Sequence, residues 1–141
     1  MVFRKVNNAD CKILLELRNE PSVRALSLNC EEINIETHSK WFASALQSND
    51  YYIYILENEQ NEVVGSGRAK LKNSQYYLSW SVFSRFRGKG YGKLIVENLV
   101  ANHLPCIAEI KEKNIPSLKI VESLGFSQVN EDNGVKLFLK E

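Results

Sequence analysis

A glycine-rich run between a strand-like and a helix-like segment constrains the fold of this chain more than any other feature. The run is Arg87-Gly88-Lys89-Gly90-Tyr91-Gly92. Residues 75–83 before it alternate in the manner of a strand, whereas residues 90–104 after it repeat with a helical period. Pro105 ends that helix, and residues 106–110 return to a strand pattern. A strand, a helix and a strand in this order predict a parallel crossover whose helix begins at the glycines.

The segments on either side extend this unit into one sheet. Hydrophobic periodicity, caps and turn residues delimit them. Further strands are expected at residues 3–6, 51–56, 63–69, 126–129 and 135–139, and further helices at residues 11–19, 34–48 and 114–125, with a short helix from Pro21. The resulting order, β-α-α-β-β-β-α-β-α-β-β, predicts an α/β fold with an α+β mixed sheet, in one domain over residues 1–141. The strand at 135–139 is expected at an edge of the sheet, where it would be free to pair with a partner.

Composition and charge exclude several classes of protein. The chain has 18 basic and 17 acidic residues and a formal charge of +1, so no basic excess favours nucleic-acid binding. The three cysteines lack C-x-x-C spacing and the two histidines have no carboxylate or thiol at ligand spacing, so neither a disulfide framework nor a metal site is predicted. No apolar run approaches the ~20 residues of a membrane span, and the N-terminus does not resemble a signal peptide. We therefore expect a cytoplasmic protein with reduced thiols and no membrane partner.

The glycine-rich run has the physical character of a phosphate site. A loop that passes from a strand into a helix presents unpaired backbone N–H groups at the positive end of the helix dipole. The glycines let a phosphate approach that backbone, while Arg85, Arg87 and Lys89 add positive charge. The G-x-G-x-G spacing matches neither the Walker loop nor the dinucleotide-binding fingerprint. The run therefore predicts a pyrophosphate cradle of another kind.

Two motifs together resemble the GNAT acetyltransferase superfamily. Residues 87–92 match its R-x-x-G-x-G signature, and residues 114–117, Asn-Ile-Pro-Ser, with Leu-Gly-Phe at 124–126, resemble its last motif. Residues 79–83 resemble the fourth strand of that family, whose backbone pairs with pantetheine, and residues 107–110 resemble its fifth strand, which splays away to open a cleft. The resemblance implies the GNAT fold and an acetyl-CoA-dependent N-acetyltransferase.

The resemblance also implies which residues contact acetyl-CoA, the expected co-substrate. Backbone groups of Val82 and Phe83 would hold the pantetheine arm. Asn114 and Ser117 would contact the pantetheine or adenosine arm, although Asn114 is equally a helix cap, a role compatible with the first. The pyrophosphate would be held by N–H groups of Arg87, Gly88, Lys89, Gly90, Tyr91, Gly92 and Lys93.

The catalytic groups are less sharply defined, because the sequence departs from the family pattern. In many members the general acid is a tyrosine four residues before the glycine of the final Leu-Gly-Phe, where this chain has Val121. Ser117 or one of the six tyrosines would replace it, although a thiol leaving group with a pKa of about 8.5 needs little acid help. For the base we favour Glu109, with Ser79 and Ser81 as relays through water. The alternatives are a solvated strand residue for Glu109 and ordinary sheet hydrogen bonds for the serines.

The N-terminal part of the chain carries the candidates for the acceptor site. Arg18, Arg24, His38 and Trp41 lie in Leu-Arg-Asn, Val-Arg and His-x-x-Trp-Phe elements. These elements resemble the N-acetyltransferases of nucleotide-linked amino sugars in pseudaminic- or legionaminic-acid pathways and, more loosely, ribosomal-protein acetyltransferases. By this resemblance the two arginines and His38 would bind a nucleotide diphosphate, and Trp41 would stack on a base or sugar. His38 and Trp41 on one helical face are also typical of a buried core.

Three functions stand as alternatives. The leading one is acetyl transfer to a small-molecule primary amine, that of a nucleotide-activated amino sugar. The second is acetylation of a protein N-terminus or lysine by the same fold, for which an acidic peptide groove is expected. The third is a noncatalytic acyl-CoA-binding module. The sequence leaves the oligomeric state open.

Overall fold

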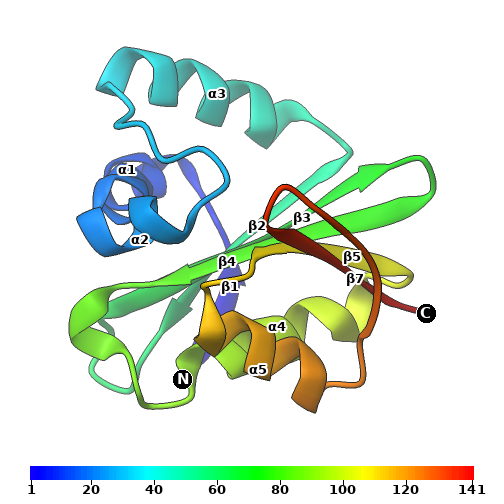
Figure 1. Ribbon diagram of the computed structural model, residues 1–141. Helices are drawn as coiled ribbons and strands as arrows, with labels where there is room; N and C mark the ends of the chain where they lie inside the picture. The colour runs from blue at the N-terminus through cyan, green and yellow to red at the C-terminus, as the bar shows by residue number, and fades with distance from the viewer.

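A seven-stranded mixed sheet, in the order β1-β2-β3-β4-β5-β7-β6, lies at the centre of the computed structural model, which describes residues 1–141 (Figure 1). The strands are β1 (Val2–Lys5), β2 (Tyr51–Glu57), β3 (Val63–Lys72), β4 (Gln75–Val82), β5 (Cys106–Lys111), β6 (Ser127–Asp132) and β7 (Val135–Lys140). The helices are α1 (Cys11–Asn19), α2 (Pro21–Leu26), α3 (Ile35–Gln47), α4 (Tyr91–Asn102) and α5 (Ile115–Ser123), with short 3₁₀ turns η1 (Asn8–Asp10) and η2 (Ser84–Phe86). The predicted mixed α/β fold is confirmed.

Three helices precede β2, because α1 and α2 are separate, and α2 is the short helix expected from Pro21. Pro21 is the first residue of α2, and Glu20 before it has an extended ψ of 128°. The ring of a proline drives the preceding residue out of the helical region, so α1 ends and the chain turns a corner at Glu20. α3 begins at its predicted cap, where the Asn34 side chain accepts a hydrogen bond from the Thr37 amide at 2.8 Å.

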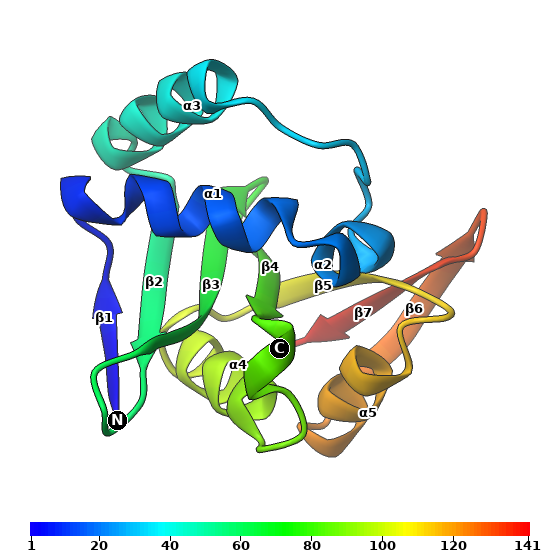
Figure 2. The same ribbon diagram turned by 90° about the vertical axis from the view of Figure 1, so that its left-hand side faces the viewer.

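The helices cover the sheet in two layers. α1, α2 and α3 lie on one face, and α4 and α5 lie on the other (Figure 1, Figure 2). The larger core includes Ile95, Val96 and Leu99 of α4, none of which has exposed surface, and extends to Leu17 and Val23 of α1 and α2. α4 approaches the sheet closely at Gly67 in β3, where a Cβ would lie 2.5 Å from Ile95 Cγ2. The smaller core contains Leu14, Phe42, Ala45, Ile53 and Ile55.

β4 and β5 separate from one another part-way along their length. Their last parallel pair is Leu78 opposite Ala108. β5 then follows β7, with which it pairs as far as its own last residue, Lys111. Residues 79–82 of β4 and 109–111 of β5 therefore line a V-shaped opening in the sheet, which we call the splay. The opening matches the splayed fifth strand that the family resemblance implies.

The C-terminal hairpin is arranged differently from the prediction. β7 lies between β5 and β6, so β6 rather than β7 is the edge strand. The turn itself is as predicted, with Asn133 and Gly134 at positive φ values of 50° and 77°. A hairpin can lie against its neighbour by either of its strands, and the alternating pattern is the same for both. Pairing through β7 places Leu137 opposite Glu109.

Candidate active site

Backbone N–H groups of β4 point into the splay. The Tyr76 amide donates to a carbonyl just before β5 (N···O 2.9 Å), whereas the Phe83 amide donates to a carbonyl of β3 (3.0 Å). Because successive residues of a strand alternate in direction, the amides of Trp80 and Val82 share the direction of Tyr76. Both lie beyond the last pair with β5. The indole N–H of Trp80 is buried without a hydrogen-bond partner, and the side chain packs against the main core.

The glycine-rich loop ends at the N-terminus of α4. A helical hydrogen bond runs from the Leu94 amide to the Gly90 carbonyl (3.1 Å), so the amides of residues 91–93 have no acceptor in the preceding turn of the helix. Gly88 and Gly90 have φ values of 76° and 84°, in the left-handed region that side chains disfavour. No atom lies within 4 Å of the position that a Cβ would take at either glycine. The space in front of the loop is open, and free amides border it.

Arg87 connects this loop to the splay. Its amide donates to the Ser84 carbonyl (3.2 Å), so this member of the expected phosphate ligands is already paired. Its side-chain Nε donates to the Val82 carbonyl (3.1 Å), and its Nη2 lies 3.9 Å from the Glu20 carboxylate. These contacts hold the loop against the end of β4 and against the corner between α1 and α2.

Glu20 was not singled out by the sequence, and it is central to this connection. Its carboxylate accepts hydrogen bonds from the Ser22 hydroxyl (2.9 Å) and the Ser84 amide (2.7 Å). Burial alone would raise the pKa of Glu20, but these hydrogen bonds and the charge of Arg87 lower it below its ordinary value. The sequence signal that could have identified it is a carboxylate immediately before Pro21, between two expected helices.

α5 begins just after the splayed end of β5. The Asn114 side chain accepts a hydrogen bond from the Ser117 amide (3.3 Å), so it caps α5. The cap occupies only the side-chain oxygen of Asn114 and leaves its amide nitrogen to another partner. Val121, one turn beyond Ser117, has no exposed surface and belongs to the main core. The position of the usual tyrosine therefore faces the core of this protein.

Ser79, Ser81 and Glu109 lie on one face of the sheet at the splay. Tyr77 and Ile107 are parallel partners, so the residues two positions later, Ser79 and Glu109, project from the same face. Glu109 is exposed. The Ser79 hydroxyl accepts a hydrogen bond from Arg68 Nε at 2.7 Å. The relay from these serines to Glu109 stays a prediction.

Four side chains from α1, α3 and β3 meet on the opposite side of the sheet from α4; we call Arg18, His38, Trp41 and Arg68 the Trp41 cluster. The guanidinium carbons of Arg18 and Arg68 lie 4.7 Å and 5.4 Å from the centre of the Trp41 ring. Arg18 Nη1 lies 3.2 Å from His38 Nδ1, and His38 Nε2 lies 2.8 Å from the Cys11 carbonyl. A carbonyl only accepts, so Nε2 carries the proton of His38 and Nδ1 accepts from Arg18.

The charges of the Trp41 cluster act on one another. Burial lowers the pKa of His38, the Cys11 carbonyl raises it, and the charges of Arg18 and Arg68 lower it further, with a net shift below 6.5. His38 is therefore neutral at pH 7, as its hydrogen bonds require. Burial and then the charge of Arg68 lower the pKa of Arg18, and burial lowers the pKa of Arg68.

The structure thus brings three of the four predicted acceptor residues together and adds one. Arg24, the fourth, has other partners: its Nε donates to the Cys30 carbonyl (3.2 Å), and its Nη1 lies 3.8 Å from Glu32. Arg68 was missed, although it is the one charged residue in the small and apolar segment 64–69. That signal marks a buried charge, but only the packing of β3 against α1 and α3 shows its neighbours.

Three of the six tyrosines are committed to another part of the molecule. Tyr52, Tyr54 and Tyr76 surround His103, with ring centroids 4.9 Å, 5.9 Å and 5.0 Å from that of the histidine. His103 is buried, and its Nδ1 lies 2.8 Å from the Leu99 carbonyl. This group stands at the C-terminal end of α4, away from the glycine-rich loop, so these tyrosines are poor candidates for the general acid.

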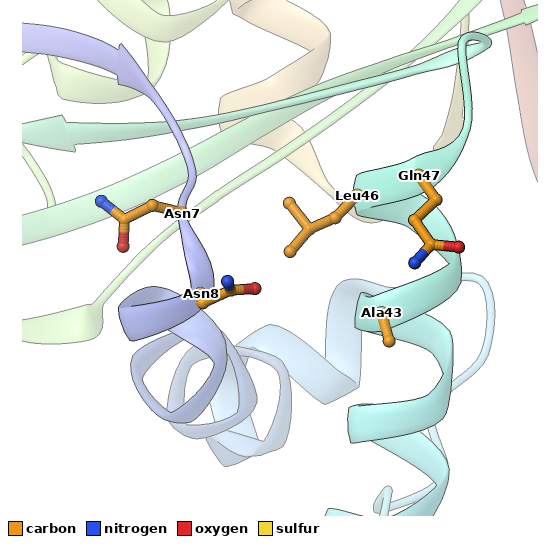
Figure 3. Close-up of a pocket in the computed structure, with 5 residues that line it drawn as sticks. All are labelled: Asn7, Asn8, Ala43, Leu46 and Gln47. Atoms are coloured by element: carbon orange, nitrogen blue, oxygen red, sulfur yellow. The ribbon is translucent and has the colours of Figure 1, made fainter.

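Two surface grooves lie outside the splay. One, of about 420 Å³, opens between η1 and α3, and Figure 3 shows its lining residues Asn7, Asn8, Ala43, Leu46 and Gln47. The other, of about 360 Å³, is lined by Gln75, Leu104, Pro105, Leu139 and Glu141. Neither contains a residue of the glycine-rich loop or the Trp41 cluster. No three histidine, cysteine or acidic side chains are grouped to hold a metal ion, and no helix is long and apolar enough to cross a membrane.

Comparison with known proteins agrees with this architecture. An uncharacterised protein of Methanocaldococcus jannaschii is 28% identical over 140 residues, which cover 93% of this chain and 29% of that protein. The chain thus spans less than a third of this relative. A ribosomal-protein-alanine N-acetyltransferase from Brucella melitensis has the same fold with a TM-score of 0.81 and 21% identity, over 99% of both chains. A spermidine N-acetyltransferase from Vibrio cholerae, solved with CoA and spermine, gives a TM-score of 0.84 at 11% identity over 98% of this chain and 92% of that one.

The match to a protein family covers most of the chain and includes the glycine-rich loop, the splay and α5. The family is described as an acetyltransferase (GNAT) domain, and residues 1–127 match it. The prediction of an acetyl-CoA-dependent N-acetyltransferase domain, made from two motifs, is confirmed at the level of the family. This chain belongs to the GNAT acetyltransferase family.

Proposed function

We propose that this domain transfers the acetyl group of acetyl-CoA to a primary amine, with both molecules bound at once. The observation that carries the proposal is the position of the splay. It opens where β4 leads into the glycine-rich loop, so free strand amides and the free amides at the N-terminus of α4 border one continuous site. Membership of the GNAT family supports the same reaction.

The residues present fit the two parts of acetyl-CoA that need holding. Amides of residues 88–93 face open space at the positive end of α4, where they would pair with pyrophosphate oxygens. The Trp80 amide would pair with the pantetheine arm in the manner of an added strand, which leaves the Val82 amide for the acetyl oxygen. Asn114 and Ser117 at the start of α5, just after β5, would contact the pantetheine or adenosine arm. Acetyl-CoA, when bound, supplies the activated acetyl group.

Direct transfer asks little further chemistry of the protein. The amine nitrogen bonds to the acetyl carbon as the C–S bond breaks, and CoA leaves as a thiolate that takes up a proton. The Val82 amide faces the negative charge that develops on the acetyl oxygen. Glu109 accepts the proton that the amine loses, through water held by Ser79 or Ser81, and the thiolate takes up a proton from water, with the Ser117 hydroxyl as the relay.

The acceptor that we propose is the amine of a nucleotide-activated amino sugar. Arg18 on α1 provides positive charge on the acceptor side of the sheet, whereas the charge of Arg24 on α2 is paired with Glu32. His38 is neutral and fixes Arg18 by a hydrogen bond, and Trp41 packs against the guanidinium group. We place the reaction in the cytoplasm, where acetyl-CoA is available and where the three free cysteines would stay reduced.

A protein N-terminus is a second candidate acceptor. The likeness to the Brucella ribosomal-protein-alanine N-acetyltransferase, which covers both chains almost completely, brings it into consideration. A peptide acceptor predicts acidic side chains beside the splay, and Glu109 is one such residue. The positive charge of Arg18 favours the nucleotide-linked acceptor instead.

Release of free CoA tests both acceptors. Wild-type protein is incubated with acetyl-CoA and a panel of UDP-amino sugars, polyamines, amino acids and N-terminal peptides. We expect the fastest release with a UDP-amino sugar. Fastest release with a peptide would favour the protein acceptor. Acetyl-CoA binding without turnover of any amine would refute the enzyme and leave a noncatalytic acyl-CoA-binding module.

A substitution in the glycine-rich loop tests the cofactor assignment. Gly90→Glu places a carboxylate where the pyrophosphate is expected, so acetyl-CoA should no longer raise the melting temperature. Gly134→Ala is the matched control, because it puts a Cβ at positive φ without close contacts, as Gly90→Ala does in the loop. Gly90→Ala and Gly90→Glu should both weaken binding, whereas Gly134→Ala should not. An undiminished shift in Gly90→Glu would contradict the cradle.

A further inference from the structure

Arg18 and Arg68 are brought together without an acidic partner. Their guanidinium groups share the ring of Trp41, at 4.7 Å and 5.4 Å from its centre. Both residues are half-buried, and the ion pairs of this structure include neither of them. The chain therefore holds two like charges side by side in a partly dry environment, which is unfavourable by itself.

Other arginines of the same chain form ion pairs with carboxylates. Arg4 pairs with Asp10 at 2.8 Å and also with Glu57. Arg24 lies 3.8 Å from Glu32, and Arg87 lies 3.9 Å from Glu20. Arg4 and Arg24, which are half-buried like Arg18 and Arg68, thus have carboxylates, and so does the exposed Arg87. The Trp41 cluster is the exception, on the side of the sheet opposite α4.

Neutral hydrogen bonds hold the two guanidinium groups in place. His38 accepts from Arg18 Nη1 at 3.2 Å, and Ser79 accepts from Arg68 Nε at 2.7 Å. Each guanidinium carries five N–H donors, so most of its donors stay available. The two groups are fixed by neutral partners and their charge is not neutralised. This is the arrangement of a preformed site for a planar or tetrahedral anion, which arginine binds through paired N–H groups.

We propose that Arg18 and Arg68 form a binding site for an anionic group of the acceptor, a phosphate or a carboxylate, and that Arg68 determines acceptor specificity. The inference rests on the proposed acetyl transfer and deepens it. In this proposal the anion binds beside β3 and α1 rather than beside α2. Trp41 does not stack on a base or sugar but packs against the two arginines. Cationic acceptors such as polyamines are disfavoured by the same pair of charges.

The position of the site also limits the shape of the acceptor. Ser79 binds Arg68 at the first residue of the splay, and Val82 lies three residues further along β4. A strand rises about 3.3 Å per residue, so the anion and the reacting amine are separated by roughly 10 Å along the strand. An α-amino acid, whose carboxylate and amine are one carbon apart, does not span that separation. An amino sugar joined to a phosphate does.

Titration with small anions tests the site directly. The protein is first saturated with CoA, so that the glycine-rich loop is occupied, and is then titrated with inorganic pyrophosphate, UDP, succinate and neutral uridine by calorimetry. We expect binding either of the two phosphates, pyrophosphate and UDP, or of succinate. Uridine should not bind. Binding of the phosphates alone identifies a phosphate group, and binding of succinate alone identifies a carboxylate. Absence of binding by all three anions overturns the proposal.

Variants tie the binding to the two arginines. Arg68→Gln and Arg18→Gln should each weaken the bound anion by roughly 10- to 100-fold, as expected for loss of a charged hydrogen-bonding partner, and Arg68→Lys should weaken it less. Lys70→Gln removes an exposed charge from the same face of β3 and serves as the matched control, with no change expected. An equal loss in Lys70→Gln, or no loss in Arg68→Gln, overturns the proposal.

Measurement of CoA binding separates this test from that of the proposed function. Arg68→Gln should bind CoA with unchanged affinity, which also shows that the variant is folded. If wild-type protein does not bind CoA, the proposed acetyl transfer fails, and the anion titration is repeated on the CoA-free protein. In that case anion binding lost in Arg68→Gln still supports the site, and no anion binding refutes it.

Discussion

His38 shows how one buried polar residue can organise a charged site. Both of its ring nitrogens have partners, the Cys11 carbonyl on one side and Arg18 on the other. The ring has no exposed surface and stacks at 6.2 Å on Phe42. The sequence left open whether His38 belongs to the core or to the acceptor site. The structure shows that it is buried and also fixes Arg18, so the two roles are compatible, and its part in the acceptor site stays a prediction.

The neutral state of His38 predicts a loss of stability in mild acid. Its pKa is lowered in the folded state and is near 6.5 in the unfolded chain. Below that value the unfolded chain binds a proton that the folded chain does not, so the free energy of unfolding falls as the pH drops below about 6.5. Denaturant unfolding at several pH values measures this slope.

A substitution at His38 tests the origin of this slope. His38→Gln should flatten the slope between about pH 7 and pH 5. The carboxylates with lowered pKa, Asp10 and Glu20, lose their contribution only at lower pH and fall outside this range. A wild-type slope that survives in His38→Gln would contradict the neutral histidine.

The burial of Val121 explains why this chain has no tyrosine at that position. The side chain is fully buried against the main core, so the larger ring would have no room there. Val121→Tyr should lower the free energy of unfolding by about 1–3 kcal/mol, as is typical of overpacked cores, without raising kcat. Denaturant unfolding and CoA release measure the two effects, with Val121→Ile as a control. A faster enzyme of undiminished stability would show that the position does reach the splay.

At the scale of elements, the sequence predicted the features that depend on residues close together in the chain. The caps of α3 and α5, the turn at Asn133 and Gly134, and the glycine-rich entry to α4 follow from local chemistry, and the structure has each of them. The order of β6 and β7 did not follow, because either strand of a hairpin can pair with β5. Arg68 was missed for the same reason, since its neighbours come from α1 and α3.

The corner between α1 and α2 predicts a role for Glu20 in binding acetyl-CoA. Its carboxylate holds the Ser84 amide and lies near Arg87, at the start of the glycine-rich loop. Glu20→Gln removes the charge but keeps the shape, so the loop should loosen and the Kd for CoA should rise by roughly 3- to 10-fold. Calorimetric titration measures it. Glu16→Gln, an exposed position on α1, should leave the Kd unchanged.

At the scale of the molecule, the parallel crossover predicted from the glycine-rich run accounts for the cofactor side of the site. β4, α4 and β5 are consecutive in the chain, so their order alone places the loop beside the splay. The acceptor side is assembled from segments far apart in sequence, residues 18, 38–41 and 68. Sequence motifs therefore specified the donor of the reaction better than its acceptor.

The contact of Glu20 with the loop also joins the two halves of the site, because Arg18 and Glu20 are two residues apart at the end of α1. Binding at the loop that shifts Arg87 is expected to shift Arg18 through that corner. Linkage then requires reciprocity: CoA should change the affinity for UDP by the same factor as UDP changes that for CoA. Paired titrations measure both factors, which should approach one in Glu20→Gln. We therefore predict that cooperative binding of the two substrates depends on the Glu20 carboxylate.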